Sequence, residues 1–198
     1  ELGSKIASLT VRNSQFRLLD MTNITATGSI RLENVTANGI SATGIDADSF
    51  TMSKVTFGGD VELYSEPGTV LDARGMRADT ITLENVLCRQ SDALIDISAG
   101  GIRQKIPNKA LTAVHQVTLR DCQVSKLRMW LLNARNVTIE NIDAQTGDFS
   151  ESIIGALSFK NTGIVSKVDF TKAKIDKISG FIKYTGQQVL TEGSNVRL

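Results

Sequence analysis

The chain has 198 residues, which suits a single domain or one module of a larger protein. Apolar residues make up 41% of it, which excludes a disordered chain, but aromatic residues make up only 5%, so Ile, Leu, Val and Ala must build the core. The net charge of +1 argues against a dedicated nucleic-acid-binding protein, although residues 160–198 hold seven Lys or Arg against three acids.

Along the chain, seven short segments share a pattern of two apolar residues, each followed by a polar one, and then usually Asn. Their starts are separated by 21, 20, 31, 36, 20 and 20 residues. The alternation predicts short strands, and Asn tolerates the left-handed conformation of a tight corner. A fixed period near 20 predicts stacked coils whose strands form parallel ladders. The segments are Leu9-Thr-Val-Arg-Asn13, Ile30-Arg-Leu-Glu-Asn34, Phe50-Thr-Met-Ser-Lys54, Ile81-Thr-Leu-Glu-Asn85, Val117-Thr-Leu-Arg-Asp121, Val137-Thr-Ile-Glu-Asn141 and Leu157-Ser-Phe-Lys-Asn161.

Two long gaps interrupt this period. Val61-Glu-Leu63 begins 20 residues before the strand after the first gap, and Ile95-Asp-Ile97 ends 20 residues before the strand after the second. We therefore interpret both as further copies of the strand, which confines the irregular sequence to residues 57–60 and 98–113. The second of these stretches contains two glycines and a proline, and it predicts a loop that projects from the side of the solenoid.

A finer period of five residues appears within some coils. Four steps of five make one coil of 20, which predicts a roughly four-sided cross-section and eight or nine coils in a single domain over residues 1–198. Residues 170–198 keep part of the apolar repeat but are rich in Lys, so they are interpreted as a cap or a junction. The five-residue step is seen at Ile30, Val35, Ile40, Ile45, Phe50 and Val55, and at Val117, Cys122, Leu127, Leu132, Val137 and Ile142.

The strands ITLENV and VTIENI, each with Asn at the corner, resemble those of the pectate-lyase-type parallel β-helix. The five-residue step is similar to that of the pentapeptide-repeat solenoids, although the pentapeptide consensus is not kept. The resemblance covers Leu9 to Ile178 and concerns architecture only. It implies an all-β fold, a right-handed parallel β-helix of about eight or nine coils of roughly 20 residues.

Catalysis by β-helix lyases and hydrolases needs clustered carboxylates with an Arg or Lys on one outer face. Three pairs have a spacing that puts both groups on one side, and none is expected to recur in a neighbouring coil at the same position. No catalytic residue is therefore predicted, and the balance favours a module that is not an enzyme. The pairs are Asp46 and Asp48, Asp72 and Arg74, and Asp92 and Asp96.

Metal and thiol chemistry also find little support in the sequence. A metal site usually needs several His or Cys ligands, whereas the chain has a single histidine, His115, so no metal or cofactor is predicted. Cys88 and Cys122 occupy different offsets from their strand motifs, which is typical of two inert thiols in the core. No apolar run is long enough to predict insertion into a membrane.

The candidate binding residues fall in two places. Trp130 is the one tryptophan of the chain, and its large aromatic side chain would anchor a partner if it faced outward beside Arg128. Burial of Trp130 inside a coil is the equal alternative. The expected side loop adds Arg103, Lys105 and Lys109, a small basic group that is more often solvated than used in recognition.

These observations favour a non-enzymatic scaffold or protein-interaction module of a larger bacterial secreted, surface or effector protein. It would bind a protein or surface partner along a solenoid face, without nucleic acid, and flanking domains of the same polypeptide would adjoin its ends. Resemblance suggests two settings, rods of adhesins similar to filamentous haemagglutinin and virulence effectors in which a β-helix precedes a ubiquitin-ligase region. The alternatives are a carbohydrate-active β-helix enzyme and a DNA mimic that binds a topoisomerase, for which a strongly acidic rod is expected.

Overall fold

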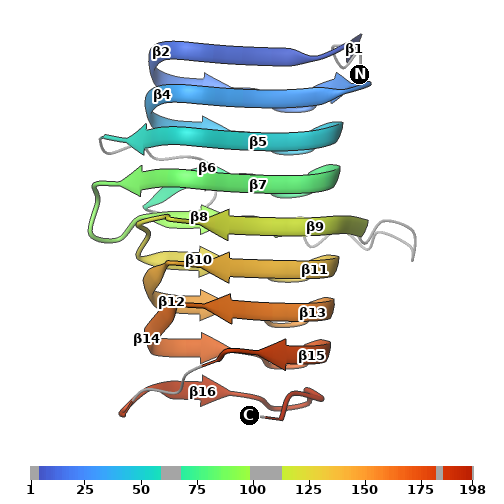
Figure 1. The fold of residues 1–198 in the computed structure, drawn as a ribbon, viewed down its shortest axis with the longest axis vertical. Helices are drawn as coiled ribbons and strands as arrows, with labels where there is room; N and C mark the ends of the chain where they lie inside the picture. The colour runs from blue at the N-terminus through green and yellow to red at the C-terminus, as the bar shows by residue number, and fades with distance from the viewer. Residues whose placement is uncertain (1–4, 59–67, 99–112, 182–184, 198) are drawn as a thin grey trace.

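The computed structural model describes residues 5–58, 68–98, 113–181 and 185–197, and these residues form a parallel β-solenoid (Figure 1). It has about eight turns, with coils about 21 residues apart, and the described residues include no helix. The strands are β1 (Lys5–Ile6), β2 (Leu9–Asp20), β3 (Thr25–Ala26), β4 (Ser29–Ser41), β5 (Asp46–Phe57), β6 (Thr69–Asp72), β7 (Arg77–Cys88), β8 (Leu94–Asp96), β9 (Ala113–Arg120), β10 (Lys126–Arg128), β11 (Asn133–Glu140), β12 (Asp143–Asp148), β13 (Ile153–Lys160), β14 (Gly163–Asp169), β15 (Lys174–Ser179) and β16 (Gln188–Leu190).

Two long ladders of parallel strands run along the solenoid axis. The first stacks β2, β4, β5, β7, β9, β11, β13 and β15, and the second continues from the far end of β4 through β6, β8, β10, β12, β14 and β16. In Figure 1 the first ladder faces the viewer and the coils wind in a right-handed sense, as expected for connections between parallel strands. The register confirms the repeat, because Val117 pairs with Val137 and Val137 with Leu157.

One part of the predicted register is wrong. Ile95-Asp-Ile97 is not a copy of the first-ladder strand, because Ile95 pairs with Leu71 and Leu127 in the second ladder. The prediction failed because the extra residues after Ser98 lengthen this coil. A count of 20 residues back from Val117 therefore reaches a strand of the second ladder instead of the first. Val61–Leu63 and residues 99–112 of the expected side loop lie outside the described residues.

The C-terminal segment continues the solenoid instead of leaving it. β15 pairs with β13, and β16 pairs with β14, both in parallel. Residues 170–181 and 185–197 therefore form the last described coil. Its role as a cap or a junction stays a prediction.

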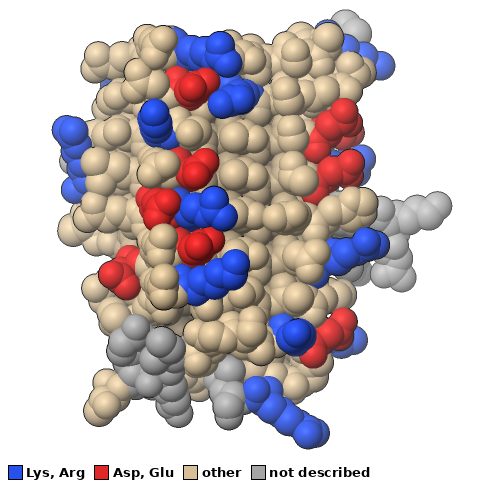
Figure 2. All heavy atoms as spheres, in the orientation of Figure 1, with Lys and Arg blue, Asp and Glu red and all other residues tan. Residues whose placement is uncertain are grey.

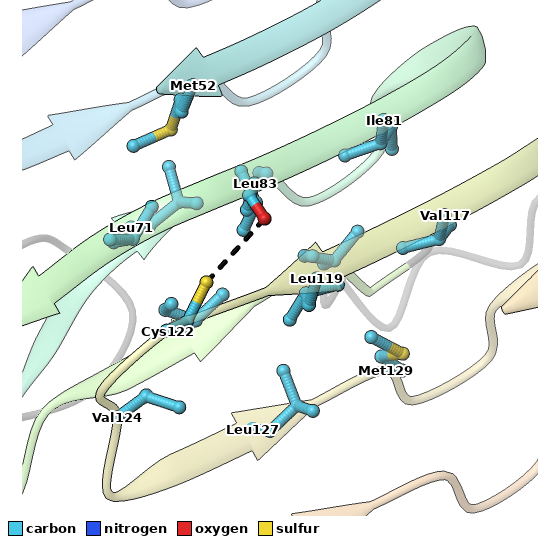
Figure 3. Packing of buried hydrophobic residues seen from close by; sticks show 14 of the residues in the cluster. Met52, Leu71, Ile81, Leu83, Val117, Leu119, Cys122, Val124, Leu127 and Met129 are labelled. Atoms are coloured by element: carbon cyan, nitrogen blue, oxygen red, sulfur yellow. Dashed lines mark hydrogen bonds between the residues drawn. The ribbon is translucent and has the colours of Figure 1, made fainter. Parts of the chain in front are cut away.

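The core is a narrow column of aliphatic side chains that stack from coil to coil. The five-residue step is confirmed as the spacing of buried residues, since Ile30, Val35, Ile40 and Ile45 are each at most 1% exposed. Figure 3 shows how Leu83 and Leu119 of the first ladder meet side chains of the second ladder inside the coil. Towards the C-terminus four phenylalanines also pack in this column. Phe149 is stacked on Phe170, with 5.5 Å between the ring centroids.

The corner after each first-ladder motif depends on a left-handed residue. The residue at the fifth position of every motif has a positive φ angle, between 46° and 55°. Side chains also bond along this column, since Asn34 Nδ2 donates to Asn13 Oδ1 at 2.8 Å and Asn141 Nδ2 donates to Asp121 Oδ1 at 2.7 Å. The predicted corner is thereby confirmed. Its residues are Asn13, Asn34, Lys54, Asn85, Asp121, Asn141 and Asn161.

A pair of substitutions at Asn85 tests the corner. Asn85 has a φ of 54°, where a β-branched side chain clashes with the backbone. We expect Asn85→Val to lower the free energy of unfolding by about 1–2 kcal/mol, and Asn85→Gly to change it by less than about 0.5 kcal/mol, because glycine adopts this conformation freely. Urea denaturation of both variants measures the difference. Equal stability of the two variants would contradict the corner assignment.

Candidate functional site

A column of aspartates marks the corner at the end of the second-ladder strands. We call this register position the aspartate column. Its occupants lie in consecutive coils, about 4.8 Å apart along the axis. In chain order they are Asp20, Ser41, Asp72, Asp96, Arg128, Asp148, Asp169 and Leu190.

Each aspartate in this column closes the turn that follows it. The backbone N–H of Ser98 donates to Asp96 Oδ1 at 3.1 Å, and the N–H of Ser150 donates to Asp148 Oδ1 at 3.0 Å. Thr171 and Asp169 repeat the same bond at 2.9 Å. A carboxylate that accepts the N–H two residues on is a standard way to stabilise a turn. The column therefore has a structural role, which the local signal Asp-x-Ser or Asp-x-Thr could have revealed.

At this column, single carboxylates from two of the pairs noted in the sequence lie in neighbouring coils, although neither pair recurs as a whole. Asp72 and Asp96 are register partners, and they are 4% and 2% exposed. Arg74 donates to both carboxylate oxygens of Asp72, with Nε and Nη2 each at 2.8 Å. The sequence concealed this stack because its members do not follow the 20-residue period. Asp72 and Asp96 are 24 residues apart, and Asp96 and Arg128 are 32 residues apart.

Arg128 interrupts the run of carboxylates. Its Nη1 lies 3.6 Å from Asp96 Oδ2, and its Nε lies 3.7 Å from Asp148 Oδ2. Burial raises the pKa of Asp96 above its usual range, and the nearby Asp72 carboxylate adds to this, whereas the hydrogen bonds from Ser98 and the Arg128 charge act in the opposite direction. Arg128 thus offsets part of the cost of burying Asp96.

Trp130 lies two residues after Arg128, in the turn that follows β10, and Met129 between them is fully buried. Its side chain is half-buried, so neither of the alternatives drawn from the sequence holds in full. The backbone N–H of Trp130 donates to Ser98 Oγ at 3.1 Å, which fixes its position on the previous coil. Arg128 and Trp130 are therefore neighbours at one corner. Arg103, Lys105 and Lys109 lie outside the described residues, and a binding role for all five stays a prediction.

The raised pKa of Asp96 predicts how stability depends on pH. Because the folded protein holds this proton more tightly than the unfolded chain, Asp96 favours folding at low pH and this contribution is lost as the pH rises from about 3.8 through the raised pKa. We expect Asp96→Asn to remove that part of the dependence and leave a flatter curve. Urea denaturation across the acidic range measures it. An unchanged slope in the variant would contradict the raised pKa.

The two cysteines are buried free thiols at different register positions, as the sequence predicted. Cys122 Sγ donates to the carbonyl oxygens of Arg120 at 3.1 Å and Leu83 at 3.6 Å, the second of which is drawn in Figure 3. Burial raises the pKa of Cys88 to about 12, with Cys122 contributing, and burial likewise raises the pKa of Cys122 to about 11. Both groups are thus protonated thiols, which are poor nucleophiles.

Thiol labelling checks this conclusion directly. In the folded protein at mildly alkaline pH, we expect a thiol reagent to modify Cys88 and Cys122 only as fast as the chain opens. In guanidinium chloride both should react within the mixing time of a manual assay. Fast reaction of either thiol in the folded state, followed by mass spectrometry, would show that it is accessible.

A half-open trough of about 730 Å³ lies beyond the first-ladder corner, across the coils of β7 to β14. Leu87, Gln123 and Asp143 line it from one register column. Gln145 and Val165 lie further along the same coils. Leu87 and Val165 are exposed apolar side chains, at 36% and 39%. The trough is therefore lined by both apolar and polar side chains on the sheet. The periodicity of the sequence did not predict it.

The outward face of the first ladder carries paired charges. Arg120 lies 3.1 Å from Glu140 and 3.9 Å from Glu84, and Arg12 lies 3.0 Å from Glu33. Figure 2 shows acidic and basic side chains interspersed down the face. At the edge of this face, His115 is exposed and its Nδ1 lies 3.7 Å from Asp79 Oδ1. Such solvated pairs contribute little stability, and they make the face hydrophilic.

These features define the chain as a right-handed parallel β-solenoid whose corner carboxylates are engaged in turns. No protein-family model, curated protein or solved structure matches the chain. Among the described residues, no three His, Cys, Asp or Glu side chains gather in a way that suits a metal ion. The described part of the chain also contains no helix that could span a membrane.

Proposed function

We propose that this chain is a non-enzymatic scaffold and protein-interaction module of a larger bacterial protein that is secreted or displayed at the cell surface, in an adhesin-like or virulence-associated role. The trough across the coils of β7 to β14 carries the proposal. The hydrogen-bonded ladders hold its lining side chains at fixed spacing, which lowers the entropy lost when a partner binds. A partner segment would lie along this solenoid face.

The composition of the trough suits a protein partner. Protein interfaces combine a few buried apolar groups with a polar rim, and the trough pairs Leu87 and Val165 with the amide of Gln123 and the carboxylate of Asp143. The trough is half-open to solvent, which suits a peptide segment better than a small molecule, because a small molecule usually needs a pocket that covers most of its area.

The alternative, a carbohydrate-active β-helix enzyme, is favoured by one observation, the adjacent carboxylates of Asp72 and Asp96. Both are almost fully buried, and each is occupied by the turn or ion-pair contacts described above. A general acid and a general base must reach the substrate, so buried carboxylates with these partners support the scaffold over the enzyme.

A pair of experiments tests the proposal. A photo-crosslinking amino acid at Gln123, in the trough, is expected to give a discrete adduct in cells that produce the protein, whereas the same group at Thr138, on the first-ladder face, is expected to give none. Absence of the Gln123 adduct, or equal adducts at both sites, would argue against the trough. In parallel, the purified chain is assayed for turnover of glycans or polyuronides. Turnover that is lost in Asp72→Asn, while circular dichroism shows that the variant is folded, would favour the enzyme hypothesis over the scaffold hypothesis.

The proposed setting is supported only by the coil length, which is similar to that of adhesin rods. It is tested separately by locating the protein in its own cells. We expect it in the medium or the cell-surface fraction. Its recovery in the cytosolic fraction alone would remove the proposed location and leave the trough experiment unaffected.

A further inference from the structure

The trough lies beside a turn that is longer in one coil than in the next. Six residues (88–93) separate Leu87 from β8, whereas two residues separate its register partner Gln123 from β10. In Figure 1 the turn that follows β7 extends beyond the turns of the coils after it. Ser125 Oγ donates to the carbonyl oxygen of Ser91 at 2.5 Å, which holds this long turn against the next coil. The turn therefore forms one wall of the trough.

Two side chains that line the trough carry opposite charges. Arg89 lies in the long turn after β7, Asp143 lies two coils further on, and both are exposed. Within the described part of the chain neither of them forms an ion pair, whereas the charges of the first-ladder face are paired with one another. Two coils correspond to about 10 Å along the solenoid axis. A ligand with opposite charges at this spacing would therefore be matched at both points.

Two glutamines in the trough supply groups that suit a peptide backbone. Gln123 and Gln145 lie in successive coils, and both are exposed. Ser166 Oγ donates to Gln145 Oε1 at 3.1 Å, so Gln145 Nε2 is left as a donor to a ligand. The side-chain amide of Gln123 has no hydrogen-bond partner among the described residues. A primary amide both donates and accepts, as the N–H and C=O groups of an extended segment require.

The lining favours a peptide over a sugar or another small molecule. Sites for small molecules are lined mainly by hydrophobic and aromatic side chains, and the described residues that line this trough include no aromatic ring. Its exposed apolar side chains, Leu87 and Val165, lie near the two ends of the trough, in the coils of β7 and β14. They offer contacts to apolar residues of a segment that is long enough to cross several coils.

We propose that the trough binds an extended segment of a partner protein that runs across the coils, with an acidic residue at Arg89 and a basic residue about three positions away at Asp143. This inference rests on the proposed interaction role of the trough and names the chemistry of its partner. Three residues of an extended chain span about 10 Å, which matches the two coils between Arg89 and Asp143. The amides of Gln123 and Gln145 bond the backbone of the segment.

The probe is a displayed library of random peptides of about seven residues, long enough to cross the trough, selected on the purified chain. We expect the selected peptides to share an acidic and a basic residue about three positions apart. One of them is labelled and titrated by fluorescence anisotropy. Arg89→Glu should weaken its binding about two- to fivefold, as an exposed ion pair predicts, and replacing the acidic residue of the peptide by Lys should restore affinity for this variant. Lys160→Glu, an equal change of charge at an exposed position of β13, is the matched control and should bind like the wild type.

The outcomes separate this inference from the proposed function. Selected peptides without a common charge pattern, or an affinity that Arg89→Glu leaves unchanged, would overturn the inference alone if the Gln123 photo-adduct with a partner is still found in cells. Absence of that adduct would remove both. A Gln123 adduct that joins two parts of the same chain, mapped by mass spectrometry, would assign the trough to a segment of the chain itself and overturn the inference. Selection of no peptide, with binding of a neutral oligosaccharide instead, would assign the trough to a sugar. Circular dichroism confirms that each variant is folded.

Discussion

The variant Val137→Asp should not fold cooperatively at neutral pH. Val137 lies in β11 of the first ladder, between Val117 and Leu157, and is 1% exposed. A carboxylate there would be taken out of water between the aliphatic side chains of Val117 and Leu157, and this desolvation is costly. We expect a loss of about 4 kcal/mol or more, which is a large part of the stability of a domain of this size. Thermal and urea denaturation followed by circular dichroism measure it.

The matched control is Asn136→Asp, which adds the same charge one residue earlier. Asn136 is exposed, so its carboxylate stays in water, and a change within about 0.5 kcal/mol is expected. If Val137→Asp melts like the wild type, the inward side of the strand has been assigned wrongly. If both variants unfold, charge at this coil is harmful for a reason other than burial.

The second large effect is expected for Arg128→Asp, which would give the aspartate column five carboxylates in consecutive coils. Asp96 would lose its cation while remaining almost fully buried. Loss of one partner of a buried ion pair costs about 3–5 kcal/mol, because the remaining charge is left uncompensated. We expect a loss in this range at neutral pH, measured by urea denaturation.

The pH dependence separates charge from shape in this variant. Protonation of the carboxylates removes their repulsion, so the difference in stability between Arg128→Asp and the wild type should shrink as the pH falls towards the usual carboxyl pKa. Arg128→Asn supplies the same turn-forming geometry without the added charge and should lose less. A penalty for Arg128→Asp that is constant with pH would indicate a packing effect instead.

Several features of the fold were predictable because they depend on neighbouring residues. Alternation in Val117-Thr-Leu119 fixes which side chains face inward, and Asn at a corner such as Asn85 satisfies a left-handed conformation locally. These signals repeat with the coil, which is why the period, the parallel ladders and the buried five-residue step were all correctly predicted. Handedness came from the resemblance, and the structure agrees with it.

The candidate sites were harder to predict for a physical reason. A column of register partners can be read from sequence only while the coils keep one length, and extra residues in two coils shift the count. Asp72, Asp96 and Arg128 therefore lay hidden as a stack, and Ile95 was placed on the wrong ladder. The half-exposed setting of Arg128 and Trp130 depends on the coil beneath them, which the sequence does not reveal.

The sequence by itself thus determined the coil, because strand alternation and corner geometry are local properties of a few residues. The tertiary structure decided what the coils bring together. It makes Asp72 and Asp96 register partners, with Arg128 in the next coil. It also forms the trough across the coils of β7 to β14. In the first described coil, it leaves Leu9 and Val11 only half-buried. Each of these depends on the register between coils of unequal length and on how many neighbours a coil has, and the repeat pattern gives the register only where the coils keep one length.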